Sequence, residues 1–240
     1  MKQHPYCYPG TDVLRNKEDI RDKDELEAVE RTLAARRLET LPRHLPISSK
    51  GYRAIHRYML QDIYDWAGEY RTVDTGRTGP FCKAEFIASE MDKRFAAINA
   101  EDNLRGLDAS RFAARAAEHA SELNAIHPFL DGNGRALRAF LEDLAEQAGH
   151  RLDLARIEPK AWNEASARAF HRMDYDPMRR IIAQAIIARE EPQRGTPESE
   201  SLRDRLARAA AAKRAERGEV ASGERRPPPD RGPRRGGRGR

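Results

Sequence analysis

The sequence predicts an all-α domain, a helical bundle with a small β-hairpin, followed by a disordered basic tail. Apolar residues recur at three- and four-residue spacing in successive segments up to about residue 188, which is typical of amphipathic helices. Between two of these segments lies one short stretch of strand-favouring and turn-forming residues. Beyond residue 192 the composition changes to Pro, Gly, Arg, Glu and Ser, which leaves little apolar surface to bury.

The first two predicted helices each have a start signal. Residues 23–39 carry apolar side chains on one face, and Asp22 or Asp24 can cap this helix by accepting a backbone hydrogen bond. A second apolar stripe follows the Ser pair at residues 48–49 and runs over residues 52–66, and Gly68 is expected to end this helix.

Residues 70–81 differ from their neighbours. Tyr, Thr and Val are followed by Asp-Thr-Gly and Thr-Gly-Pro, which predicts a short hairpin or an ordered loop. Helical spacing then returns, and we expect helices over residues 83–100, 110–126, 132–148, 159–170 and 176–188.

The domain organisation follows from the distribution of charge. The chain has 240 residues and a net charge of +5. Residues 193–240 contain 14 Arg and Lys against 7 Asp and Glu, which leaves 30 basic and 32 acidic residues before them. We therefore expect one mildly acidic domain over residues 1–192 and a basic tail over residues 193–240. The tail is interpreted as a solubilising end, an arm that contacts nucleic acid, or a signal for a secretion machinery.

The chain begins without the apolar core of a signal peptide, and no apolar run is long enough to span a membrane. We therefore expect a soluble protein of the cytoplasm. Cys7 and Cys82 stand far apart in the sequence and are expected to be free thiols.

The chemistry is expected in residues 127–138, which read HPFLDGNGRALR. The glycines of the turn at residues 132–134 let backbone amides approach a ligand closely, and the helix that begins there directs its N–H groups to the same place. Asn133 can donate through its amide. Arg135 and Arg138 are three residues apart, so they share a helix face and can reach successive phosphates.

Asp131 and His127 complete this predicted site. A carboxylate beside phosphates is repelled unless a cation bridges them, so Asp131 predicts a divalent metal, most simply Mg²⁺. A histidine titrates near neutral pH, which suits His127 to take the proton of an attacking hydroxyl. Base, metal, anion site and arginines together predict phosphoryl or nucleotidyl transfer.

This string resembles the signature of the Fic family, His-Pro-Phe-x-(Asp/Glu)-Gly-Asn-Gly-Arg-x-x-Arg, at every fixed position. The resemblance extends to GEYRT at residues 68–72 and YPGTDVLRNK at residues 8–17, and it covers about residues 6–187. It implies the Fic fold, a helical bundle with a β-hairpin flap. The implied activity is that of a protein adenylyltransferase, which moves AMP from ATP to a Ser, Thr or Tyr hydroxyl of another protein.

The resemblance also implies a role for each motif residue. His127 is then the general base, and Asp131 binds Mg²⁺. Phe129 anchors the loop in the core, and residues 72–81 form the flap that aligns the target protein by main-chain pairing. The residues implied to bind ATP are Gly132, Asn133, Gly134, Arg135 and Arg138.

Gly134 and Arg138 separate two reaction types. Doc-like relatives that phosphorylate their targets carry Lys at the position of Gly134 and lack the second arginine, so the resemblance favours AMP transfer. One alternative is a Fic enzyme that transfers another phosphate-containing group. The other is a regulatory or binding protein that uses its basic tail on nucleic acid.

The resemblance finally suggests how activity is controlled. Fic proteins are commonly silenced by a helix bearing (Ser/Thr)-x-x-x-Glu-(Gly/Asn), whose Glu pairs with the second motif arginine, here Arg138. The chain has no intact copy of this motif, so a small separate antitoxin is expected. The chain is then a toxin of a toxin-antitoxin module or an effector secreted into a recipient or host cell. The nearest internal candidate is Glu200, in residues 196–201.

Overall fold

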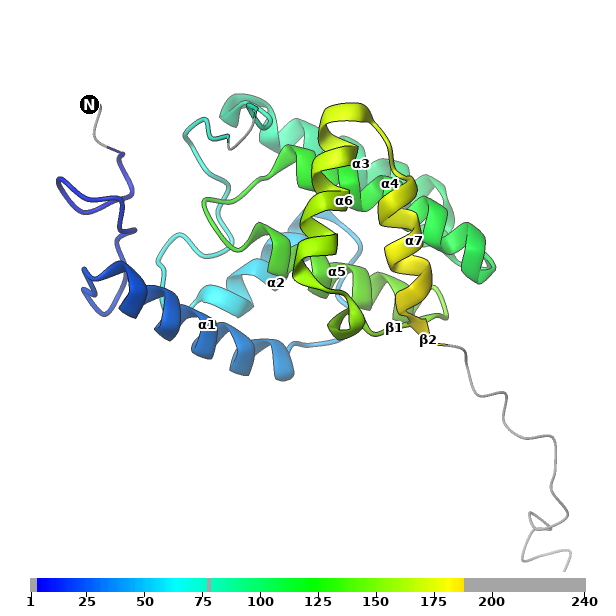
Figure 1. Ribbon diagram of the computed structural model, residues 1–240, viewed down its shortest axis with the longest axis horizontal. Coiled ribbons are helices and arrows are strands. Elements are labelled where there is room, and N and C mark those ends of the chain that lie inside the picture. Colours follow the sequence, from blue (N-terminus) through cyan, green and yellow to red (C-terminus); the bar gives the residue numbers. More distant parts are fainter. Residues whose placement is uncertain (1–3, 77–78, 188–240) are drawn as a thin grey trace, which may run out of the picture. The chain divides into compact units, whose positions relative to one another are not determined.

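The computed structural model describes residues 4–76 and 79–187, whose helices form a bundle (Figure 1). The helices are α1 (Lys23–Glu39), α2 (Ser49–Leu60), α3 (Ile87–Ala100), α4 (Ala109–Ile126), α5 (Asn133–Gln147), α6 (Pro159–Arg172) and α7 (Asp176–Ala185). Two short strands, β1 (Arg151–Leu152) and β2 (Ile186–Ile187), pair antiparallel. The predicted all-α fold class is confirmed.

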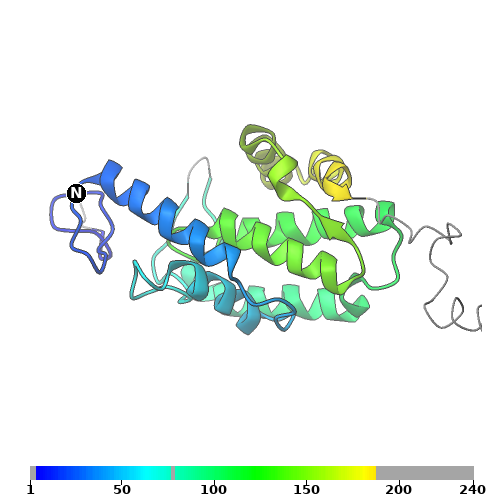
Figure 2. The ribbon, with the colours of Figure 1, turned by 90° about the horizontal axis from the view of Figure 1, so that it is seen from below.

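The helices lie in layers around α4 and α5. Figure 2 shows α2 and α3 on one side of this central pair and α6 and α7 on the other. The core between α2, α3 and α5 contains an aromatic cluster that also receives the loop before α5. Tyr52 stacks on Phe129 with 5.6 Å between ring centroids and meets Phe140 edge-on at 5.5 Å. Phe95 meets the same Phe140 edge-on at 5.4 Å.

Side-chain caps fix the starts of three helices. Asp22 accepts a hydrogen bond from the backbone of Glu25 at the start of α1, as one of the two predicted caps. Ser48 and Asp108 do the same for α2 and α4. Each cap satisfies an N–H group of the first turn that the helix itself leaves without a partner.

The predicted end of the second helix is wrong. α2 ends at Leu60, and the residues up to Gly68 form successive turns. The backbone N–H of Lys17 donates to the carbonyl of Ile63 at 2.9 Å, so a partner distant in the sequence replaces the helical one. Apolar spacing continues through these turns because Ile63 and Trp66 still face the core, and the spacing alone does not distinguish turns from helix.

Residues 70–76 and 79–81 form a loop with one antiparallel bridge, between Gly76 and Pro80. Residues 77–78 lie outside the described part of the chain. The two-stranded sheet lies elsewhere and was not predicted, since β2 directly continues the last helix, where two isoleucines leave the helical conformation and pair with β1.

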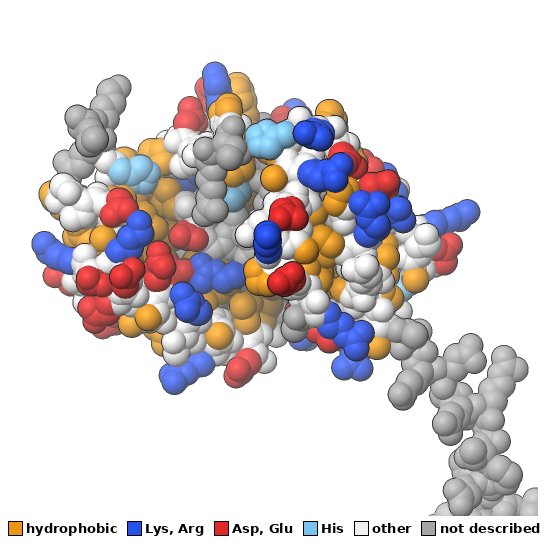
Figure 3. All heavy atoms as spheres, viewed as in Figure 1, with side chains coloured by type: hydrophobic (Ala, Val, Ile, Leu, Met, Phe, Trp, Pro, Cys, Tyr) orange, Lys and Arg blue, Asp and Glu red, His pale blue; other side chains and the backbone are white. Residues whose placement is uncertain are grey.

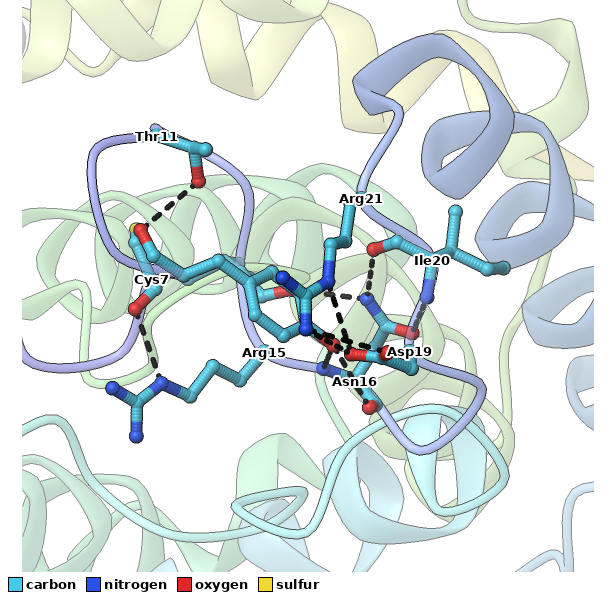
Figure 4. Close-up of polar contacts among 9 residues, drawn as sticks. Cys7, Thr11, Arg15, Asn16, Asp19, Ile20 and Arg21 are labelled. Atoms are coloured by element: carbon cyan, nitrogen blue, oxygen red, sulfur yellow. Dashed lines mark hydrogen bonds and ion pairs between the residues drawn. The ribbon is translucent and has the colours of Figure 1, made fainter.

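The N-terminal segment is held by its own polar groups (Figure 4). Arg15 Nε donates to the carbonyl of Cys7 at 3.1 Å, and Asn16 exchanges two hydrogen bonds with the backbone of Ile20, at 2.7 and 2.9 Å. Tyr6 reaches the loop after α2, where its hydroxyl lies 2.8 Å from Thr72 Oγ1. The opening segment is thereby tied to the approach of the flap.

The compact unit extends over Met1–Arg189. The predicted basic tail, residues 193–240, lies outside the described residues. Within residues 4–76 and 79–187, no helix has the length and apolar character that a membrane crossing requires. Cys7 and Cys82 are free thiols, as expected.

Candidate active site

An open cavity of about 600 Å³ lies between the end of α4, the beginning of α5, the arms of the flap and one face of α6. Figure 3 shows this face hollowed between α1 and α6, with basic side chains inside the hollow. The residues predicted for the site all line the cavity: His127, Asp131, Gly132, Asn133, Gly134, Arg135 and Arg138. The fold therefore brings the whole predicted set to one place.

His127 ends α4 in the left-handed backbone conformation, with φ 49° and ψ 62°. This conformation is unfavourable for a non-glycine residue by about 1–2 kcal/mol, so surrounding contacts must hold it. Its N–H donates to the carbonyl of Leu123 at 3.2 Å, and its own carbonyl accepts from Arg71 Nε at 2.9 Å. The imidazole stacks on Phe81, with 3.9 Å between centroids and 2° between planes.

Phe129 and Asn133 close the loop that follows His127. Phe129 is fully buried and stacks on His56, with 3.7 Å between ring centroids. Asn133 Oδ1 accepts from the N–H of Phe129 at 2.9 Å, and Nδ2 donates to the carbonyl of Phe129 at 2.8 Å. The side-chain amide that we expected to reach phosphate is engaged here instead, because burial removes these backbone groups from water. The backbone N–H of Asn133 lies in the first turn of α5, at the edge of the cavity.

His56 supports the same loop from α2. Its Nδ1 accepts the N–H of Gly68 at 2.9 Å, so the proton resides on Nε2, which donates to the carbonyl of Asp131 at 2.9 Å. Burial lowers the pKa of His56 to about 4, which leaves the ring neutral at physiological pH. Gly132 has φ +75°, and a Cβ there would lie 2.9 Å from Leu60 Cδ1 and 3.2 Å from His56 Nε2. Backbone conformation and space both require glycine at this position.

The start of α5 has the features of an anion site. The helix begins at Asn133, so the N–H groups of its first turn have no acceptor within the helix. A Cβ on Gly134 would meet nothing within 4 Å, which leaves open space beside this turn. Unpaired N–H groups and the positive end of the helix dipole favour a negatively charged ligand there.

Arg135 lies in a network of charged and hydroxyl groups. Its Nη2 binds Glu30, a buried residue of α1, and lies 3.6 Å from Asp131 Oδ1. The second oxygen of Glu30 accepts the hydroxyl of Tyr64. Burial, together with the hydrogen bond to Glu30, raises the pKa of Tyr64, so its hydroxyl stays protonated and continues to donate. The Asp131 side chain is 55% exposed, and its Oδ1 accepts the backbone N–H of Gly132.

Arg138 lies deeper along α5 than Arg135. Its guanidinium carbon lies 5.8 Å from the ring centre of Trp162. Burial, and secondarily the charge of Arg135, lower the pKa of Arg138 from its ordinary value. No ion pair within the described residues involves Arg138, so a bound anion would compensate for its removal from water.

Comparison with known proteins identifies the family. The family model for Fic/DOC matches residues 46–145. The probable protein adenylyltransferase y4lH of Sinorhizobium fredii is 41% identical over 171 residues, which cover 70% of this chain and 88% of that protein. The chain belongs to the Fic/DOC family. The probable protein adenylyltransferase Fic of Escherichia coli is also 41% identical, over 169 residues that cover 68% of this chain and 82% of that protein.

A solved Fic-family structure extends the comparison to the fold. The BepC effector protein of Bartonella tribocorum, crystallised with bound AMPPNP, superposes with a TM-score of 0.72 at 26% identity. The alignment covers 76% of this chain and 96% of that one. The predicted family, and the predicted enzyme class of protein adenylyltransferase, are confirmed by these relatives.

One wall of this Fic cavity was not predicted. α6 presents Asn163, Ser166, Ala167 and Phe170 to the cavity. Phe170 meets Phe81 edge-on, with 5.5 Å between centroids. Ser166 Oγ is buried and has no hydrogen-bond partner among the described residues. The three- and four-residue spacing along α6 was visible in the sequence, but the spacing does not tell a cavity wall from ordinary core.

Three buried polar residues outside the Fic motif support the site and were also missed. Glu30 binds Arg135, His56 holds the carbonyl of Asp131, and Arg71 holds the carbonyl of His127. Each lies far from its partner in the sequence. For Glu30 and His56 the available signal was a polar residue within a predicted amphipathic helix, and for Arg71 its place in GEYRT at residues 68–72. Neither signal indicates what the side chain contacts.

Proposed function

We propose that this chain transfers AMP from ATP to a Ser, Thr or Tyr hydroxyl of a target protein, with His127 as general base. The observation that carries the proposal is that His127 lines the same cavity as the anion-binding start of α5. The target oxygen bonds to the α-phosphorus, the bond from this phosphorus to the β-bridging oxygen breaks, and pyrophosphate leaves. The imidazole takes the hydroxyl proton.

The phosphates of ATP would be bound at the start of α5. The backbone N–H groups of Asn133 and Gly134 would donate to phosphate oxygens, which suits a turn whose open side lies beside Gly134. The N–H of Gly132 donates to Asp131 Oδ1 and would join them by leaving this contact. Arg135 and Arg138 would hold the β- and γ-phosphates, because they share the cavity-facing side of the same helix. The related BepC protein was crystallised with bound AMPPNP, which supports an adenine nucleotide as the ligand of this fold.

Asp131 fits a role as ligand for Mg²⁺. Its carboxylate is largely exposed, lines the cavity and lies next to the helix start where phosphates would bind. Mg²⁺ is commonly bound by one or two carboxylates together with substrate phosphates and waters. When bound, the ion would supply charge neutralisation between the carboxylate and the polyphosphate.

The adenine ring would lie against α6. Phe81 and Phe170 offer aromatic edges and faces to the purine. The Ser166 hydroxyl is buried, has no hydrogen-bond partner among the described residues, and would offer the purine a polar group. Asn163 lines the same wall one turn earlier. A cavity of about 600 Å³ is within the range that nucleotide-sized ligands occupy.

The target protein would be bound through the flap, residues 72–81. Thr75 and Gly76 line the cavity beside His127, and an extended target segment would pair with the flap backbone as an added strand. Such pairing recognises the main chain, so it brings a hydroxyl-bearing side chain to His127 with little dependence on the surrounding sequence.

Activity would be held in check by a separate antitoxin that supplies a glutamate to Arg138. A groove of about 230 Å³ opens beside Arg138 and Glu142, and its apolar side is formed by Leu38, Leu41 and Leu154. An amphipathic helix suits this combination of apolar wall and cation. The chain would act in the cytoplasm of its own cell as a toxin, or in a recipient cell after secretion.

Glu200, the candidate for inhibition by the chain itself, lies outside the described residues. So does the whole tail, to which the nucleic-acid and secretion roles were assigned. Full-length protein, Glu200→Gly and a chain of residues 1–192 would be compared for AMP transfer. A large gain in either variant would replace the antitoxin by self-inhibition. Equal activity of all three would leave inhibition to a partner.

The central test is transfer of label from α-labelled ATP to proteins of a bacterial lysate. The parent protein should label a protein band, whereas His127→Ala should not, because a general base contributes about 10² to 10⁴ in rate. His44→Ala, which changes an exposed histidine remote in sequence from the motif, is the matched control and should keep full activity. Near-normal labelling by His127→Ala, or transfer of γ-label in place of α-label, would refute the proposal.

A further inference from the structure

Arg71 is a buried cation whose side chain, among the described residues, donates hydrogen bonds to backbone carbonyls only. The residue is 2% exposed. Its Nε donates to His127 at 2.9 Å and its Nη1 to Val73 at 2.8 Å. Its Nη2 donates to Cys82 at 2.5 Å and to Ile126 at 3.3 Å. A guanidinium presents its donors in a fixed planar fork, so the positions of these four carbonyls are constrained relative to one another.

These carbonyls belong to two parts of the site. Val73 lies near the start of the flap, and Cys82 directly follows its last residue. Ile126 and His127 lie at the end of α4, where the general base projects. The backbone strengthens the same connection, because the N–H of Arg71 itself donates to the carbonyl of Pro128 at 2.9 Å. Arg71 therefore joins the arms of the flap to the base.

The conformation of His127 makes this connection consequential. The left-handed backbone turns the His127 carbonyl away from the helical direction of α4. This carbonyl accepts the hydrogen bond of Arg71 Nε. Without that donor, a backbone conformation that is unfavourable for a non-glycine residue loses a charge-assisted hydrogen bond. The imidazole is carried by this backbone, so its direction depends on the bond.

We propose that Arg71 is a positioning residue for AMP transfer. It fixes the position of the general base His127 relative to the target segment that the flap binds. The inference rests on the proposed function. The flap would position the attacking hydroxyl, and the end of α4 positions the imidazole that accepts its proton. The Arg71 guanidinium contacts both segments. Among the described residues, Arg71 contacts the flap region and residues 126–128 but not the start of α5, so we expect ATP binding not to depend on it.

The test uses full-length Arg71→Ala and Arg71→Lys, with Arg115→Ala as control. Arg115 also makes two 2.7 Å contacts, to Glu101, on the side of the bundle formed by α3 and α4, so its loss is a comparable structural change away from the flap. Each variant is assayed with α-labelled ATP and the protein band that the parent labels. The measured quantities are kcat, KM for ATP, and the melting temperature with and without ATP.

For Arg71→Ala we expect kcat to fall about 10²-fold, the size of effect that a displacement near 1 Å produces, while KM for ATP stays unchanged. Arg71→Lys keeps the charge but not the fork, so its kcat should lie between that of Arg71→Ala and the parent. Guanidinium at millimolar concentration should restore part of the kcat of Arg71→Ala and should not raise that of Arg115→Ala.

Three outcomes would overturn the inference. They are a kcat for Arg71→Ala near that of the parent, a loss that appears in KM for ATP rather than in kcat, and unfolding of both Arg71 variants, which would make Arg71 a folding residue only. The proposed function is tested separately by the parent enzyme and His127→Ala. Failure of the Arg71 prediction would therefore leave AMP transfer standing.

Discussion

The two glycines of the motif are expected to respond oppositely to the same substitution. Gly132 has φ +75°, and an added Cβ would lie 2.9 Å from Leu60 Cδ1 and 3.0 Å from Met59 Cε. Gly134 lies in the first turn of α5 with helical backbone, and an added Cβ there would meet nothing within 4 Å. Gly132→Ala therefore perturbs the fold, whereas Gly134→Ala perturbs the space in which phosphate would bind.

The magnitudes follow from these environments. For Gly132→Ala, the left-handed backbone costs about 1–2 kcal/mol and the crowding of packed methyl groups about 1–3 kcal/mol more. These add to about 2–5 kcal/mol, so at roughly 2–4 °C per kcal/mol for a domain of this size the melting temperature should fall by about 4–20 °C. Gly134→Ala should leave it unchanged or raise it slightly, because alanine is preferred over glycine in a helix by up to about 1 kcal/mol.

The ligand-binding effects should have the reverse order. A methyl group at Gly134 hinders the approach of phosphate to the first-turn N–H groups, and loss of one hydrogen bond to a charged group, worth about 1.5–3 kcal/mol, weakens ATP binding roughly 10- to 100-fold. Thermal unfolding by circular dichroism measures the first effect, and titration with a fluorescent ATP analogue measures the second. An unchanged melting temperature for Gly132→Ala, or normal ATP affinity for Gly134→Ala, would refute the reasoning.

Three further predictions concern the groups around the motif. Asp131→Asn should keep the fold, because the side chain is 55% exposed, but should shift the Mg²⁺ dependence of AMP transfer to higher concentration; an unchanged Mg²⁺ titration would remove Asp131 from the metal site. Glu30→Ala should lower the free energy of unfolding by about 1–3 kcal/mol and raise KM for ATP, because Arg135 loses its buried partner. Glu27→Ala, at an exposed position of the same helix, should change neither quantity. Burial lowers the pKa of His56 to about 4, so between pH 6.5 and 4 the unfolded chain binds more protons than the folded one. The stability present above pH 6.5 is therefore lost on acidification, by about 2 kcal/mol at pH 5. Urea unfolding at pH 7.5 and pH 5 should show a smaller loss for His56→Gln than for the parent, and equal losses would count against this assignment.

Local patterns predicted most of the helices but not their contacts. The cap at Asp22 and the apolar face of residues 23–39 located α1, yet nothing in that stretch indicated that Glu30 turns inward to Arg135. The second helix was predicted too long because turn residues that face the core continue the apolar spacing. Periodicity reports which side chains are buried, and it reports less well how the backbone carries them there.

The sequence by itself determined the family, the enzyme class and the residues of the motif, because these lie in one continuous string whose spacing suits a loop and the first turn of a helix. Only the tertiary structure decided how that string is held. The side chain of Asn133 closes the loop. His56 holds the carbonyl of Asp131, and Arg71 holds the carbonyl of His127. These roles arise from contacts between residues far apart in the chain, and such contacts form only when burial forces each polar group to find a partner.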